Sequence, residues 1–117
     1  MKYNVKITEI GDIALDFLSE NMLIIFNNNA PKELAEMSVM HEIKELGSDV
    51  EVDDLIEIGG KEYMVTAVGG EANSTLRKMG HCSFKFDGER EAQLPGTIHL
   101  KGDGNPEITV GGYITII

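Results

Sequence analysis

Hydrophobic and polar residues alternate along most of the chain, and a period of two is typical of β-strands with one buried face. Tyr3, Val5 and Ile7 fall on one side of the first such segment, with polar residues between them. The run from Met22 to Phe26 is apolar on both sides and is predicted to be a central strand. Further strands are predicted over residues 38–45, 55–58, 62–68, 82–86, 97–101 and 113–117.

Helical periodicity is scarce. The strongest pattern covers residues 71–79, where Ala72, Leu76 and Met79 share one face. Gly80 follows this segment and suits the left-handed cap at the end of a helix. Two shorter helices are predicted over residues 12–19 and 31–37, the latter with proline at its first position.

Turn residues separate the predicted strands. Gly59-Gly60 is a two-residue connection that suits a tight hairpin, Asp87-Gly88 supplies a turn with positive φ, and Pro95-Gly96 leads into a strand. About eight short strands in 117 residues predict an all-β fold in one domain, residues 1–117. A closed barrel removes the exposed strand edges of a small open sheet. We therefore expect a single small closed or partly closed β-barrel with one to three short helices.

The charge balance narrows the classes of partner. The chain carries 10 Lys and Arg against 20 Asp and Glu, a formal net charge of −10. This charge repels nucleic-acid phosphates and anionic membranes, so neither is an expected partner. It attracts a protein partner with a basic patch, or it serves only to keep the chain in solution.

Cysteine usage and the apolar runs indicate the compartment. A single cysteine, Cys82, excludes an internal disulfide and fits a reducing environment. It alternates with Phe84 and Phe86, which indicates a buried apolar residue rather than a nucleophile. The first residues, MKYNVKITEI, lack the apolar run of a signal peptide, and no stretch is long enough to span a bilayer. A cytoplasmic protein without membrane insertion is expected.

Histidines are the candidate chemical groups, and each of them also has a structural interpretation. His41 shares a predicted strand face with Val39 and Ile43, which by itself favours a packed strand residue. His81 directly follows the Gly80 cap. There it would either bond free carbonyls at the helix end or support a second histidine by orienting it.

The third histidine, His99, alternates with apolar residues and is expected on a solvated outer face. With Thr97 and Lys101 it would alternatively form a small anion-binding row. No metal and no cofactor are expected, because the sequence contains neither His-Glu-x-x-His nor Cys-x-x-Cys. Gly69-Gly70 lacks the Lys and Ser/Thr of a nucleotide-binding loop, so a nucleotide-dependent kinase is not expected either.

Four short motifs follow one another within residues 65–100: VTAVG, LRKMGH, FDG and PGTIH. Their series resembles the IIA component of the glucitol/sorbitol phosphotransferase system, and weaker motifs extend the resemblance over nearly the whole chain. The resemblance implies a phosphocarrier that works through a histidine. In the family that histidine follows an MLI-F strand and an AP--L turn. Here MLIIFNNNAPKEL is followed by AEMSVMH, which implies His41.

The resemblance also implies partners. A phosphoryl group would pass from phosphoenolpyruvate to enzyme I, then to the carrier protein HPr, then to His41, and finally to the membrane-bound sugar-specific components. His81 is the candidate for a supporting role. A second histidine that members of the family can carry two residues after the first is replaced here by Ile43. The sequence leaves open the polyol, the phosphorylated ring nitrogen and whether the chain forms a homodimer.

The alternative hypothesis is a non-catalytic β-barrel binding module with structural histidines. The two hypotheses differ in what they expect of His41. An accessible ring would favour the carrier, because an attacking nitrogen must reach phosphorus. A fully enclosed ring with both nitrogens bonded would favour the binding module.

Overall fold

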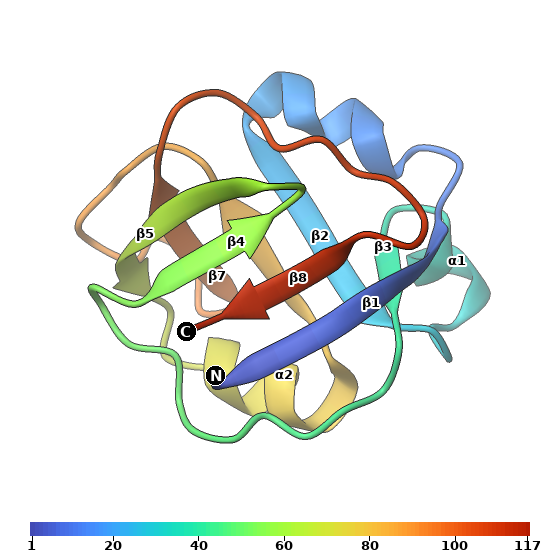
Figure 1. The fold of residues 1–117 in the computed structure, drawn as a ribbon, viewed down its shortest axis with the longest axis horizontal. Helices are drawn as coiled ribbons and strands as arrows, with labels where there is room; N and C mark the ends of the chain where they lie inside the picture. The colour runs from blue at the N-terminus through green and yellow to red at the C-terminus, as the bar shows by residue number, and fades with distance from the viewer.

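Eight β-strands close into a barrel in the computed structural model, which describes residues 1–117 (Figure 1). Around the barrel the strands follow the order β1-β3-β2-β6-β7-β5-β4-β8. In chain order the elements are β1 (Tyr3–Ile10), η1 (Ala14–Glu20), β2 (Met22–Asn27), α1 (Lys32–Ala35), β3 (Val39–His41), β4 (Leu55–Ile58), β5 (Lys61–Val68), α2 (Ala72–Met79), β6 (Cys82–Lys85), β7 (Thr97–Lys101) and β8 (Tyr113–Ile116). The predicted small all-β barrel is confirmed.

Two of the strand pairs are parallel, β2 with β3 and β6 with β7, and the other six are antiparallel. Each parallel pair joins strands that are consecutive in the chain, so the connection must cross from one end of the barrel to the other. Residues 28–38, which include α1, make the first crossing, and residues 86–96 make the second. The second crossing lies against the outer face of β5 and β7, where Glu89 accepts a hydrogen bond from Thr66.

The barrel interior is filled mainly by alternate residues of the strands, which together with residues of the helices and loops form a cluster of 22 buried side chains. Tyr3, Tyr63 and Phe84 are among the largest, and most of the others are Ile, Val and Leu. Cys82 belongs to this cluster and is completely buried, as its alternation with phenylalanines predicts. Burial raises the pKa of its thiol, so the group stays protonated and unreactive.

Strand β3 is shorter than the predicted segment 38–45. It ends at His41, and Ile43 lies beyond it with 57% of its surface exposed. The chain then leaves the sheet and packs Leu46 and Val50 against the core. The expectation that His41 and Ile43 share a strand face is therefore wrong. The strand ends at His41, because the following residues leave the sheet to cover the core.

The helices follow their predicted ends closely. Helix α2 packs against β2 and β6, and Gly80 caps it in the left-handed conformation with φ 60°. The segment predicted over residues 12–19 forms the 3₁₀ helix η1, and Pro31 is the residue before α1 rather than its first residue. Figure 1 places the two chain ends side by side, where the Lys2 N–H donates to the Ile116 carbonyl (2.8 Å). None of the helices is long and apolar enough to cross a membrane.

Candidate functional site

His41 lies at the end of β3, between β1 and β2. It pairs with Ile7 on β1 and with Asn27 on β2. Its ring meets the edge of the Tyr3 ring, with the centroids 5.8 Å apart and the planes at 86°. The residue is 0% exposed. The barrel therefore holds this histidine as a packed residue and not as a side chain open to solvent.

Both nitrogens of the His41 ring face backbone carbonyls. Nδ1 lies 2.8 Å from the carbonyl oxygen of Glu42, and Nε2 lies 2.8 Å from that of Gly80. A carbonyl oxygen accepts and never donates, and a neutral imidazole has only one N–H. Both contacts are hydrogen bonds only when the ring carries two protons. The neutral ring, which is the nucleophilic form, leaves one bare nitrogen directed at an acceptor.

Gly80 reaches the ring because it has no side chain. A Cβ at this position would lie 2.0 Å from Asn27 Oδ1 and 2.7 Å from His41 Cε1. The left-handed cap of α2 and the close approach to His41 therefore depend on the same glycine. The sequence predicted the cap. It gave no sign of the contact, which joins residues far apart in the chain.

Two residues that neighbour His41 each carry a buried polar atom without a hydrogen-bond partner, the Tyr3 hydroxyl and Asn27 Oδ1. Burial, with a smaller contribution from Cys82, raises the pKa of Tyr3 to about 12, so the phenol remains neutral. Unpaired polar atoms are rare in protein interiors. Their occurrence next to the candidate nucleophile marks this end of the barrel as unusual.

His81 does not contact the His41 ring through any hydrogen bond. Its Nδ1 lies 3.0 Å from the Ile25 carbonyl on β2, and its ring packs on Phe26 with the centroids 4.8 Å apart. The predicted bond to a free helix carbonyl is wrong, because β2 offers its own carbonyl where α2 ends. His81 is connected to the site only through its neighbour Gly80, which it helps to fix on β2.

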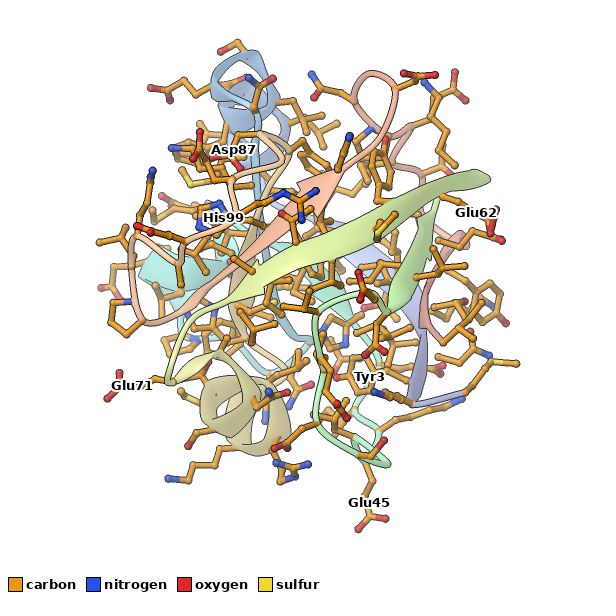
Figure 2. The ribbon with its side chains drawn as sticks, turned by 90° about the vertical axis from the view of Figure 1, so that its left-hand side faces the viewer. Tyr3, Glu45, Glu62, Glu71, Asp87 and His99 are labelled. Atoms are coloured by element: carbon orange, nitrogen blue, oxygen red, sulfur yellow. The ribbon has the colours of Figure 1, made fainter.

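His99 is buried, contrary to the expectation of a solvated outer face. It is 0% exposed, and its Nδ1 donates to Asp87 Oδ1 (2.9 Å) while its Nε2 accepts from the Gln93 N–H (3.4 Å). The crossing over residues 86–96 covers this part of β7, and the two side chains lie together on the outside of the barrel (Figure 2). The surface row with Thr97 and Lys101 does not form, because only the lysine is exposed.

Asp87 should stabilise the fold in a pH-dependent way. Burial opposes its ionisation, but hydrogen bonds from His99 and from the Glu89 N–H outweigh burial and lower its pKa below the ordinary value. A group whose pKa is lowered by folding stabilises above its unfolded pKa, and the contribution disappears as the pH falls through the folded pKa. We expect Asp87→Ala to lower the free energy of unfolding by about 1–3 kcal/mol at pH 7, because His99 loses its acceptor.

The measurement is urea denaturation between pH 7 and pH 3. The difference between wild type and Asp87→Ala should begin to shrink below about pH 4, where the carboxyl of the unfolded chain takes up its proton, and shrink further as the pH falls through the lowered pKa of the folded state. Asp103→Ala is the matched control, because that carboxylate is exposed and makes no hydrogen bond or ion pair. A difference that is constant over this pH range would contradict the role of the Asp87 charge.

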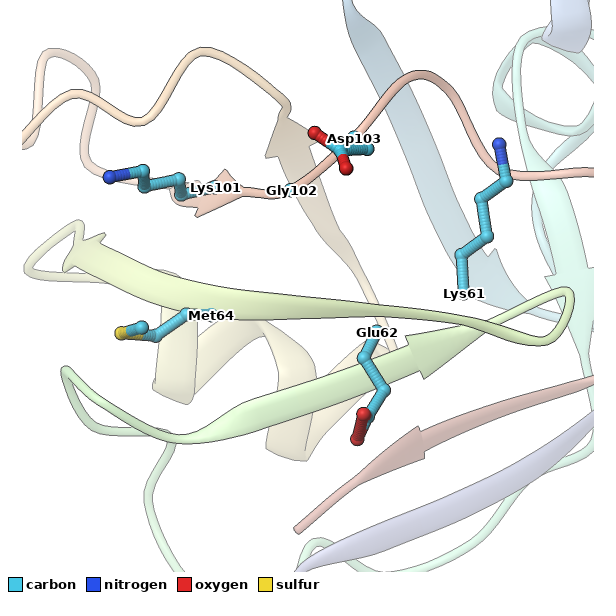
Figure 3. Close-up of a pocket in the computed structure, with 6 residues that line it drawn as sticks. All are labelled: Lys61, Glu62, Met64, Lys101, Gly102 and Asp103. Atoms are coloured by element: carbon cyan, nitrogen blue, oxygen red, sulfur yellow. The ribbon is translucent and has the colours of Figure 1, made fainter.

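The surface hollows do not coincide with the histidines. The largest, with a volume of about 520 Å³, is an open groove along β5 and the end of β7, lined by Lys61, Glu62, Met64, Lys101, Gly102 and Asp103 (Figure 3). None of the three hollows includes a histidine. No three His, Cys, Asp or Glu side chains are grouped as metal ligands would be.

Comparison with known proteins gives consistent matches. Residues 2–115 match the family model described as the PTS system glucitol/sorbitol-specific IIA component. The chain is 39% identical over 112 residues to the PTS system glucitol/sorbitol-specific EIIA component of Escherichia coli K12, covering 96% of this chain and 91% of the relative. The protein of the same name from Shigella flexneri gives the same values. The crystal structure of the PTS system IIA component from Enterococcus faecalis V583 superposes with a TM-score of 0.86 at 28% identity, covering 97% of this chain and 98% of that one.

Proposed function

Because the chain belongs to the glucitol/sorbitol-specific IIA family of the phosphotransferase system, we propose that it is a cytoplasmic phosphocarrier with His41 as the phosphorylated residue. Membership makes it a component of a sugar phosphotransferase system and a protein of the transferase kind. The observation that supports the assignment to His41 is its place after the segment MLIIFNNNAPKEL, within the residues 2–115 that match the family. In the structure its two nitrogens face two carbonyls, which a neutral ring cannot satisfy together.

The two carbonyl contacts of the His41 ring differ in how easily they can be broken. The Glu42 carbonyl belongs to the residue next to His41, and the Glu42 N–H is tied to Lys6 on β1 (3.0 Å). The Gly80 carbonyl comes from the end of α2, which takes no part in the pairing of β1 with β3. We therefore assign the proton to Nδ1, facing Glu42, and the lone pair to Nε2, facing Gly80.

Transfer then needs no cofactor. When the end of α2 moves, the Nε2 lone pair attacks phosphorus and a nitrogen–phosphorus bond forms. The bond from phosphorus to the donor breaks, and its electron pair stays with the donor. The Nδ1 proton remains with the ring, held by the Glu42 carbonyl. The reverse step on the next partner restores the neutral ring.

The proposed donor is phospho-HPr, charged by enzyme I from phosphoenolpyruvate, and the proposed acceptor is a membrane-bound sugar-specific component. A net charge of −10 would steer encounter with a basic face on such a partner. These encounters should weaken with added salt, because exposed charges are screened. His81 supports the site by fixing the end of α2 that carries the Gly80 carbonyl.

The enclosed His41 ring favours one rival function, a non-catalytic binding module with structural histidines. Incubation with enzyme I, HPr and phosphoenolpyruvate, followed by intact mass spectrometry, separates the two. A carrier gains one phosphoryl group that is lost in acid. A chain whose mass stays unchanged, while HPr itself becomes phosphorylated, would support the binding module.

A further inference from the structure

Asn27 is a buried polar residue whose side-chain oxygen takes no part in the hydrogen bonds of the fold. It ends β2 and pairs with His41 on the neighbouring strand. It is 7% exposed, and its Oδ1 is fully enclosed without a hydrogen-bond partner. A buried acceptor without a partner is unfavourable, because it has lost its bond to water and gained nothing in return. The two residues that follow, Asn28 and Asn29, are exposed.

The Asn27 carboxamide lies against the part of His41 that would react. The position of a Cβ on Gly80 would be 2.0 Å from Asn27 Oδ1 and 2.7 Å from His41 Cε1, so both atoms border the same point. Cε1 is the ring carbon bonded to both nitrogens. The carboxamide is therefore next to the space that the Gly80 carbonyl leaves when it moves away from Nε2.

We propose that Asn27 binds the phosphoryl group on His41 through its side-chain N–H groups, an inference that rests on the proposed function. A phosphoryl group on Nε2 brings oxygens with negative charge into an enclosed site, and these oxygens need donors. The carboxamide has two N–H donors. A half-turn about its Cβ–Cγ bond exchanges Oδ1 for Nδ2 without changing the shape of the side chain, so that an N–H donor can take the place of the unpaired acceptor beside His41.

The neutrality of asparagine suits a carrier. A charged donor would hold the phosphoryl group more strongly, because it adds the attraction between opposite charges to the hydrogen bond. A carboxamide stabilises the phosphorylated state without preventing transfer to the next partner. In the unphosphorylated state two carbonyls face the His41 ring. In the phosphorylated state the Asn27 carboxamide would bind the phosphoryl oxygens, so each state of His41 has its own hydrogen-bond partners.

The first test measures the rate at which the full chain is phosphorylated by phospho-HPr. Asn27→Ala is expected to slow the reaction at least tenfold, the effect of one lost hydrogen bond of about 1.4 kcal/mol in the transition state. Asn28→Ala and Asn29→Ala are matched controls from the same run of asparagines and should react at the wild-type rate. A folded Asn27→Ala protein that reacts at the wild-type rate overturns the proposal.

The second test needs no variant of Asn27 and so does not depend on its folding. The side-chain ¹H–¹⁵N signals of the wild-type protein are recorded before and after phosphorylation. The Asn27 amide should shift strongly, and those of Asn28 and Asn29 should not. If His41 becomes phosphorylated and the Asn27 amide does not move, the inference fails and the proposed function stands. If His41 is never phosphorylated, the proposed function fails.

Discussion

His41→Gln is expected to abolish the phosphoryl group that the wild-type chain gains from phosphoenolpyruvate, enzyme I and HPr. Glutamine has a similar length and an amide N–H, but it has no nitrogen lone pair that can attack phosphorus. The substitution also removes a fully buried ring that packs against the edge of the Tyr3 ring. We expect this loss of packing to lower the free energy of unfolding by about 1–3 kcal/mol, which a barrel of this size should tolerate.

Intact mass spectrometry measures the result, and circular dichroism shows whether the variant is folded. His81→Ala and His99→Ala are the controls, since each removes a histidine that the proposal does not phosphorylate. Both should still gain one acid-labile group. Incorporation into folded His41→Gln would assign the phosphoryl group to another residue and remove the basis of the proposed mechanism.

Much of the barrel was predictable because its strands, turns and caps depend on residues that are close together in the sequence. Alternation placed the strands, and Gly59 and Gly60 have the positive φ values, 58° and 80°, that a tight hairpin requires. Gly80 has the predicted left-handed conformation. Each of these features depends on residues next to each other in the chain. The family resemblance is likewise confirmed by the match over residues 2–115.

The surroundings of the histidines were not predictable, because distant segments create them. His99 is buried by the crossing over residues 86–96, and period-two alternation says nothing of what covers a strand from outside. The partners of His41 include Gly80, a residue 39 positions away in the chain. His41 as the phosphorylated residue stays a prediction, drawn from the resemblance in sequence. Asn27 was missed because a run of three asparagines after a strand is typical of a turn.

Gly80→Ala should be the most destabilising of the glycine substitutions near the site. Alanine costs about 1–2 kcal/mol in the left-handed conformation. The new Cβ would also overlap Asn27 Oδ1 and His41 Cε1, at 2.0 and 2.7 Å, and overpacking of this kind costs typically about 1–3 kcal/mol more. We therefore expect a total loss of about 2–5 kcal/mol in the free energy of unfolding, measured by urea denaturation.

Gly60→Ala separates the two contributions. Gly60 also has a positive φ, 80°, but a Cβ there would meet nothing within 4 Å. Its substitution should cost only the backbone term of about 1–2 kcal/mol, so the difference between the two variants measures how tightly Gly80 packs on His41. If the two substitutions lowered the free energy of unfolding equally, the end of α2 at Gly80 would be loosely packed against the His41 ring. In that case Nε2 would already be accessible, and phosphorylation would not require the end of α2 to move.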